Sequence, residues 1–220
     1  MQYKIKENLR TIQEKIAPCK PNIIAVTKYF DENAIVEAYE AGLRDFGESR
    51  VIEASEKIER LPEFVKNNST FHFIGHLQSN KAKRAVERFD VIHSVDSFRL
   101  ASKISEYAQE IGKVQNILLQ LNNANEIQKS GFSKDELFSD FENILNLPSV
   151  KVIGLMNMAP LGAEDSSLHT LFRNVRETRD ELELKFNCKL PELSMGMSQD
   201  YEIAAEEGAT ILRIGRKLFG

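Results

Sequence analysis

Residues 21–30 read PNIIAVTKYF, and this stretch indicates a buried strand that ends at a polar position. Residues 23–26 are four apolar residues in succession within an expected strand at 22–27, which is typical of a strand covered on both faces. Lys28 follows at the C-terminal end, where its side chain can reach a cavity. An ammonium that loses water there becomes a neutral amine more readily, and such an amine can attack a carbonyl carbon to form an imine. The alternative is an ordinary lysine that extends into solvent at a strand end.

Length and charge narrow the class of protein. The chain has 220 residues, which suits a single domain over residues 1–220, either an α/β barrel or a doubly wound sheet. Its formal charge of −4 shows no basic excess of the kind that nucleic-acid binding needs. The N-terminal residues lack the apolar core of a signal peptide, and no apolar run is long enough to span a bilayer. We therefore expect a cytoplasmic protein without nucleic-acid or membrane partners.

A pattern of one strand followed by one helix recurs along the whole chain. Asp31 and Ser97 stand where they can cap helices, Gly42 can end the first of these, and Ser133 with Glu136 has the spacing of a capping box. An amphipathic helix precedes the first strand. The strands that the pattern predicts are residues 22–27, 43–48, 71–75, 91–95, 116–121, 152–156, 192–195 and 210–214.

Eight such units of about 25 residues each, with an extra helix in front, are what a closed parallel (β/α)8 TIM barrel requires. A doubly wound open sheet is the alternative, but it would usually show a glycine-rich first turn, which this chain lacks. In a barrel, the side chains at the C-terminal ends of the strands converge on one rim. The residues expected on that rim are Lys28, Ser49, His76, Asn123, Met156, Ser198 and Arg213.

Two turns near the C-terminus have the character of an anion site. Residues 193–198, LSMGMS, put a glycine and a hydroxyl between a strand and a helix that starts near Asp200, so backbone N–H groups and Ser198 can face an anion. Residues 213–216, RIGR, repeat the arrangement one strand later, and the loops after strands seven and eight of a barrel often hold phosphate. Each turn alone could be an ordinary helix cap. Together with an amine across the mouth, they favour a phosphorylated aldehyde.

A set of motifs covers essentially the whole chain. They are AVTK at 25–28, AGLRDFGESRV at 41–51, FHFIGHLQSNK at 71–81, HSVDS at 93–97, QKSGF at 128–132, GLM and AP around Met156, LSMGMSQDYEIAAEEGAT at 193–210, and RIG and FG at the C-terminus. By these motifs the chain resembles the YggS/PROSC family of pyridoxal phosphate homeostasis proteins. The resemblance implies a barrel related to the N-terminal domain of alanine racemase, with pyridoxal 5'-phosphate bound as an imine on Lys28. It also implies a monomer or weak dimer that carries the cofactor for pyridoxal phosphate-dependent apo-enzymes, with no established catalytic reaction.

The resemblance also implies roles for individual residues. The aldehyde carbon is held by Lys28, the pyridine nitrogen faces Arg213, and the phosphate is held by the Ser198 hydroxyl and the amides of Met197, Gly215 and Arg216. The permanent charge of Arg213 disfavours protonation of the ring nitrogen, so the ring is a weak electron sink. The chain departs from the family at Ser49, where asparagine is usual, which leaves one polar contact near the ring open. At Arg216, threonine or serine is frequent, but a backbone amide can still serve.

The alternative function is a pyridoxal phosphate-dependent racemase or related enzyme, and a Schiff-base aldolase is a further alternative. A racemase needs a second acid or base on the opposite face of the imine. In alanine racemase a separate C-terminal domain supplies part of the site, whereas this chain ends at Gly220. Tyr29 and Tyr201 are candidate acids, but we interpret both as core residues. We therefore predict a carrier that does not catalyse a reaction.

The remaining polar residues have plainer interpretations. The four histidines are His72, His76, His93 and His169. They lack ligand spacing on one helix face, so we interpret them as satisfied or exposed residues and not as metal ligands. Cys19 and Cys188 are far apart, which indicates reduced, unpaired thiols. Lys81 and Lys129 fall in expected mouth loops and are candidates for transient cofactor acceptors.

Overall fold

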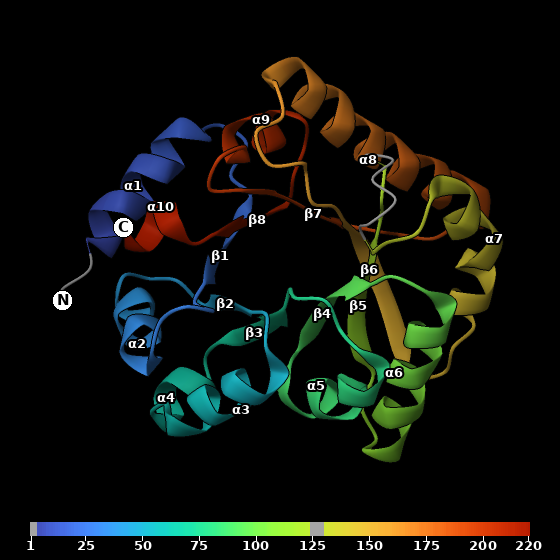
Figure 1. Cartoon of the computed structure of the whole chain (residues 1–220), viewed down its shortest axis with the longest axis horizontal. Coiled ribbons are helices and arrows are strands. Elements are labelled where there is room, and N and C mark those ends of the chain that lie inside the picture. The colour runs from blue at the N-terminus through green and yellow to red at the C-terminus, as the bar shows by residue number, and fades with distance from the viewer. Residues whose placement is uncertain (1–3, 124–129) are drawn as a thin grey trace.

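Eight parallel strands close into a barrel in the computed structural model, which describes residues 4–123 and 130–220 (Figure 1). The strands are β1 (Asn22–Val26), β2 (Asp45–Glu48), β3 (Thr70–Phe73), β4 (Val91–Val95), β5 (Gln115–Gln120), β6 (Val150–Met156), β7 (Glu192–Met197) and β8 (Ile211–Ile214). Each strand pairs with the next, and β8 pairs with β1 so that Arg213 lies opposite Ile24 and Ile214 opposite Ala25. The predicted (β/α)8 barrel is therefore confirmed.

Helices surround the strands on the outside of the barrel (Figure 1). They are α1 (Ile5–Lys15), α2 (Glu32–Glu40), α3 (Val51–Arg60), α4 (Glu63–Lys66), the short 3-10 helix η1 (Ser79–Lys81), α5 (Ala82–Arg88), α6 (Phe98–Glu110), α7 (Lys134–Leu145), α8 (Asp165–Phe186), α9 (Tyr201–Glu206) and α10 (Arg216–Phe219). Helix α1 is the extra N-terminal helix that the sequence predicts. It packs beside α10, where Asn8 Nδ2 donates to the Leu218 carbonyl at 2.9 Å.

Local side-chain caps begin three of these helices. The Asp31 side chain accepts from the Ala34 amide, and Ser97 accepts from the Leu100 amide. Ser133 and Glu136 exchange hydrogen bonds in a complete capping box at the start of α7. All three caps were expected from residue type and spacing, because a cap satisfies amides within its own turn and needs no distant partner.

Several element boundaries differ from those predicted. Strand β3 ends at Phe73 and not at Gly75. The chain at Gly75 passes against the Ser49 backbone, where an added Cβ would lie 2.3 Å from the carbonyl oxygen. Strand β7 continues to Met197 and pairs there with Arg213. Helix α4 was not predicted; it follows Pro62, and its buried Val65 shows that packing holds this short turn in place.

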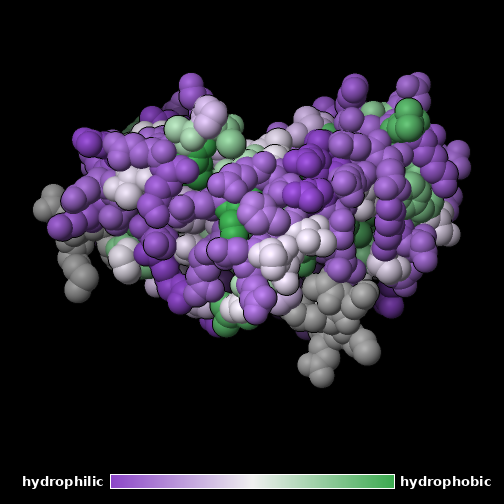
Figure 2. Space-filling view, turned by 90° about the horizontal axis from the view of Figure 1, so that it is seen from above, coloured by the Kyte–Doolittle hydropathy of each residue, from purple (hydrophilic) through white to green (hydrophobic). Residues whose placement is uncertain are grey.

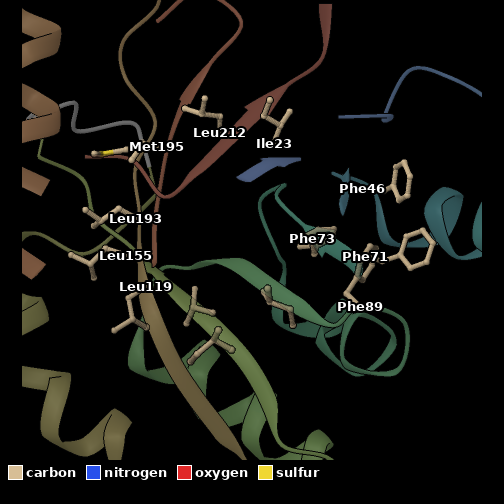
Figure 3. Close-up of a cluster of buried hydrophobic side chains, with 14 of the residues drawn as sticks. Ile23, Phe46, Phe71, Phe73, Phe89, Leu119, Leu155, Leu193, Met195 and Leu212 are labelled. Carbon is tan, nitrogen blue, oxygen red and sulfur yellow. The ribbon is translucent and has the colours of Figure 1, made fainter. Parts of the chain in front are cut away.

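Alternate residues of the strands build two different layers. The side chains of Phe46, Phe71, Phe73, Leu193, Met195 and Leu212 belong to one large apolar cluster (Figure 3). Phe46 lies near Phe71, and Phe73 near Phe89 on the helical side, with ring centroids 6.0 and 5.2 Å apart. The residues between them along the strands, such as His72, Ser194 and Arg213, face the barrel interior instead, because successive side chains of a strand point to opposite faces.

The outer surface carries mostly polar side chains. The face in Figure 2 is largely hydrophilic, with small and separate hydrophobic areas. No helix within the described ranges 4–123 and 130–220 is long and apolar enough to cross a membrane. The apolar residues of the helices are instead used for packing against the strands, as the cluster around Phe172 and Leu182 of α8 shows.

Gly154 provides a test of the contact between β6 and β7. A Cβ at this position would lie 1.8 Å from the Glu192 carbonyl oxygen, so we expect Gly154→Ala to lower the free energy of unfolding by about 3 kcal/mol. Gly162→Ala is the matched control, since Gly162 has a φ of +76° but open space around it, and only the left-handed backbone costs about 1 kcal/mol there. Urea denaturation measures both values. Equal losses in the two variants would contradict the packing described for these strands.

Candidate functional site

Lys28 lies on the C-terminal rim of the barrel, two residues after β1. The chain turns there, with the Phe30 amide donating to the Thr27 carbonyl at 2.9 Å. Lys28 is exposed, and its Nζ lies 5.0 Å from the centroid of the Tyr29 ring. The expectation that this amine loses water is therefore not met by the structure. Tyr29 is 80% exposed, so its interpretation as a core residue is wrong; β1 has ended before it, and the alternation of the strand no longer applies.

A buried ion pair supports the backbone immediately before Lys28. Glu48 Oε1 accepts from Thr27 Oγ1 and from Lys57 Nζ, both at 2.7 Å, and Lys57 Nζ also donates to the Thr27 carbonyl at 2.8 Å. The Glu48 and Lys57 side chains are only 3% and 9% exposed. Because one carboxylate and one ammonium bind both the side chain and the carbonyl of Thr27, they restrict the peptide from which Lys28 projects. Sequence reasoning missed Lys57, which resembles any other lysine of an amphipathic helix.

The turns after β7 and β8 meet at Ser198. Its Oγ accepts from the Gly215 amide at 3.3 Å and from the Lys217 amide at 3.4 Å. Ser198 is 9% exposed, whereas the Arg216 side chain is exposed. Amides of the last turn thus point toward one hydroxyl oxygen, as donors to an anion would. The Lys217 amide is not among the three amides that the sequence predicts for the phosphate.

The Met197 amide is already engaged within the chain. It donates to Asp200 Oδ1 at 2.5 Å. Burial raises the pKa of Asp200, although the Met197 amide and the Arg213 charge act in the opposite direction. A phosphate contact to this amide, as the sequence predicts, would require the bond to Asp200 to open.

Arg213 is buried inside the barrel with both terminal nitrogens hydrogen-bonded. Nη1 donates to the Ser194 carbonyl at 2.6 Å and to Ser194 Oγ at 2.7 Å, and Nη2 donates to the Asn157 carbonyl at 2.8 Å. Burial lowers the pKa of Arg213 to about 10, against the attraction of Asp200. These contacts hold the plane of the guanidinium and do not use Nε. The sequence analysis did not identify Ser194 or Asn157 as partners of Arg213. The alternation of β7 could have indicated Ser194, which lies between the outward-facing Leu193 and Met195.

The histidines divide between the interior and the surface. His72 and His93 are buried, and His72 Nδ1 lies 2.9 Å from His93 Nε2. His76 is exposed on the rim, with Nδ1 3.2 Å from Ser130 Oγ and 3.5 Å from Asp96 Oδ2. Their interpretation as satisfied or exposed residues is confirmed for these three.

The other residues predicted for the rim differ in their positions. Ser49 is half-buried beside Gly75, and Asn123 accepts from Asn157 Nδ2 at 2.8 Å. Met156 is fully buried in a cluster with Val91 and Leu118, so its predicted place on the rim is wrong. It is the last residue of β6, and it shares the buried cluster with Ile153 because the register of β6 shifts against β5 between the two residues. Lys81 is half-buried at the end of η1, and the prediction for Lys129 lies outside the described residues.

Two cavities of comparable size lie away from Lys28. One of about 440 Å³ lies between Asn123, Pro160 and helix α8. The other, of about 410 Å³, lies at the N-terminal end of the barrel, where Asp45, His72 and Glu192 are among its lining residues. The rim site is therefore recognised by its functional groups and by strand register.

Comparison with known proteins places the chain in a family. A model of the alanine racemase N-terminal domain matches residues 2–220. A pyridoxal phosphate homeostasis protein of Aquifex aeolicus is 42% identical over 198 residues, which cover 90% of this chain and 86% of the relative. A second, from Synechocystis, is 41% identical over 209 residues, covering 94% and 95%. The chain belongs to the pyridoxal phosphate homeostasis protein family.

Solved structures agree with this family and with the resemblance seen in the motifs. PipY of Synechococcus elongatus, with pyridoxal phosphate (PLP) bound, is 40% identical and superposes with a TM-score of 0.88 over 99% of this chain and 100% of PipY. An alanine racemase of Clostridium difficile is 14% identical, with a TM-score of 0.75 over 97% of this chain and 56% of the racemase. This second likeness shows the shared barrel fold alone.

The functional groups of the rim fit a phosphorylated aldehyde. An amine follows β1, a guanidinium lies on β8, and two amides of the last turn point at a hydroxyl. Register brings them to one part of the rim, because β8 lies between β1 and β7. A Cβ on Gly215 would lie 3.5 Å from Val26, which shows how near the last turn is to the end of β1.

The pair of Glu48 and Lys57 can be tested by its stability. Lys57→Met leaves the Glu48 carboxylate buried without its cation, and we expect the free energy of unfolding to fall by about 3–5 kcal/mol. Adding Glu48→Gln to that variant should recover part of the loss. Lys83→Met is the control, because the Lys83 and Glu110 pair is exposed and should change little. Urea denaturation of the four proteins decides; equal effects of Lys57→Met and Lys83→Met would contradict the buried pair.

Proposed function

We propose that this chain binds pyridoxal 5'-phosphate at the C-terminal rim of its barrel, holds it as a Schiff base on Lys28, and takes part in vitamin B6 homeostasis without catalysis. The observation that carries the proposal is the strand order, in which β8 with Arg213 lies between β1, which Lys28 follows, and β7, which Ser198 follows. The relatives named for pyridoxal phosphate homeostasis, and the PLP-bound PipY, support it. Residues 1–220 would then work as one cofactor-binding unit.

Lys28 supplies the covalent contact in this proposal. Its neutral amine attacks the aldehyde carbon, the nitrogen gives up both of its protons, and the aldehyde oxygen leaves as water. The exposed position of Nζ makes it accessible to an incoming aldehyde and to a recipient that later removes it. The Thr27 backbone, bound by Glu48 and Lys57, limits the positions from which Lys28 can act.

The phosphate contacts come from the last two turns. Ser198 Oγ and the amides of Gly215 and Lys217 form the part of the site whose donors point together. The Arg216 amide and the Met197 amide complete the predicted set, the latter after its bond to Asp200 opens. The charged side chain of Arg216 adds positive potential where threonine or serine is usual, and Ser49 is the candidate for a polar contact near the ring.

Arg213 and Tyr201 support a carrier that does not catalyse a reaction. A guanidinium beside the ring nitrogen disfavours its protonation, and the electron-withdrawing chemistry that the cofactor supplies is then weak. Burial, with a hydrogen bond to Glu202, raises the pKa of Tyr201 to about 12, so this hydroxyl is a poor proton donor to a substrate near neutral pH. Pyridoxal phosphate-dependent apo-enzymes as recipients, cytoplasmic location and a monomer or weak dimer belong to this proposal.

The covalent link is tested by trapping. Borohydride reduction of the wild-type chain mixed with pyridoxal phosphate should leave a pyridoxyl group on the Lys28 peptide, and Lys28→Ala should lose both the adduct and the absorbance of the bound cofactor. Lys83→Ala is the control, because Lys83 is an exposed amine that is paired with Glu110, and its loss should change neither the adduct nor the absorbance. An adduct on a different lysine would overturn the site. Turnover of alanine or serine by wild type well above Lys28→Ala would favour the racemase alternative.

The phosphate site is tested by comparing two ligands. Ser198→Ala removes the hydroxyl at the meeting point of the last two turns, and we expect about tenfold weaker binding of pyridoxal phosphate. Binding of pyridoxal, which has no phosphate, should be nearly unchanged. Fluorescence or absorbance titration measures both affinities. If the two ligands lose equal affinity, Ser198 does not act on the phosphate.

A further inference from the structure

A line of polar side chains crosses the barrel interior from Arg213 to its opposite end. Ser194 Oγ lies 2.7 Å from Arg213 Nη1 and 2.9 Å from His93 Nδ1, and His93 Nε2 lies 2.9 Å from His72 Nδ1. His72 Nε2 in turn lies 2.9 Å from Asp45 Oδ1. We call these five residues the interior line. It joins the rim to the cavity of about 410 Å³ at the N-terminal end of the barrel, which Asp45 and His72 help to line.

Every donor of the interior line finds an acceptor when each hydrogen bond points from Arg213 toward Asp45. A guanidinium has only N–H donors, so Ser194 Oγ must accept from Arg213. Although burial acts to raise it, the hydrogen bond from His72 leaves the pKa of Asp45 below its ordinary value, so Asp45 is an accepting carboxylate. His72 therefore donates through Nε2–H, accepts at Nδ1 from His93, and leaves His93 Nδ1 to accept from the Ser194 hydroxyl. Each bond then points from the guanidinium toward the carboxylate.

One additional proton would break this order. If His72 carried two protons, its Nδ1–H would donate to His93, and His93 would donate from Nδ1 to Ser194 Oγ. The Ser194 hydroxyl proton would then lack its acceptor, since over residues 4–123 and 130–220 the hydrogen bonds of Ser194 Oγ are those with Arg213 and His93. Burial, followed by the effects of His72 and Arg213, also lowers the pKa of His93 well below its ordinary value. The hydrogen-bond pattern thus favours two neutral imidazoles, each with its proton on Nε2.

We propose that the interior line positions Arg213 for the cofactor. In this arrangement the side chains of Ser194, His93 and His72 each donate their hydrogen bond toward Asp45. This inference rests on the proposed function and extends it from the rim into the barrel. Among the described residues, the Ser194 carbonyl and hydroxyl take both N–H groups of Nη1, and the Asn157 carbonyl takes one N–H of Nη2. The donors left are Nε–H and the second N–H of Nη2, and a pyridine nitrogen that accepts from one of them stays unprotonated. The electronic character of the bound ring thus depends on residues that do not touch it.

The direction of the line is tested without any cofactor. ¹⁵N NMR of the full chain, labelled at histidine, distinguishes the two imidazole nitrogens, and we expect His72 and His93 to be neutral with the proton on Nε2. His169, which is partly exposed on α8, serves as an internal reference. A proton on Nδ1 of His93, or a doubly protonated His72, would overturn the proposed direction.

The effect on the cofactor is tested by two serine variants. Ser194→Ala removes one acceptor of Arg213 Nη1, the hydroxyl, and with it the donor to His93, while the bond from Nη1 to the Ser194 carbonyl remains. We expect about tenfold weaker binding of pyridoxal phosphate and a shifted absorbance of the bound ring. Ser105→Ala is the matched control, because Ser105 is equally buried and accepts from the Ser149 amide at 3.1 Å on the outer layer. Its binding and absorbance should equal those of wild type.

The outcomes separate this inference from the proposed function. Ser194→Ala with wild-type affinity and absorbance would overturn the positioning role while leaving covalent binding on Lys28 intact. If Ser194→Ala and Ser105→Ala both bind the cofactor more weakly and both leave its absorbance unchanged, the cause is a general loss of stability. That result would also overturn the positioning role. Failure of wild type to form any adduct on Lys28 would instead overturn the proposed function, and with it the role of Arg213 at the ring.

Discussion

The pairing of the last strand with the first is the constraint on which the rest of the structure depends. Arg213 lies opposite Ile24 and Ile214 opposite Ala25, and this pairing closes the sheet. A closed barrel has no free strand edge, and all its strand ends form one ring. Lys28 and the turn at Gly215 become neighbours for this reason, although nearly the whole chain separates them. The candidate site is thus a product of closure and not of one local motif.

A buried guanidinium imposes the second constraint. Arg213 is only 4% exposed, and a charge removed from water is tolerated when hydrogen bonds and an opposite charge compensate it. The Ser194 and Asn157 contacts supply the hydrogen bonds, and the opposite charge that acts on Arg213 is that of Asp200. The same strands present apolar residues to the helices, so one alternation supplies both a hydrophobic layer and a polar interior. The hydrophobic layer and the polar interior are therefore coupled through strand register.

The parts of the structure that the sequence predicted well are those that depend on near neighbours. The caps at Asp31 and Ser97 and the strand at residues 91–95 were found where residue type and alternation put them. The errors fall at strand ends. Tyr29 was expected inside and is exposed, and Met156 was expected on the rim and is buried. At a strand end, the direction of a side chain depends on the residue at which the chain leaves the sheet. Pairing with the neighbouring strands decides which residue that is.

The sequence by itself determined the class of fold, the order of its elements and the residue types that stand at the strand ends, because alternation, helical periodicity and capping act over a few residues. Only the tertiary structure decided that Lys57 is buried against Glu48, that Asp200 takes the Met197 amide, and that two histidines join Arg213 to Asp45. These contacts link different strands and helices across the barrel. Their geometry follows from register and closure, and no pattern within a single segment records it.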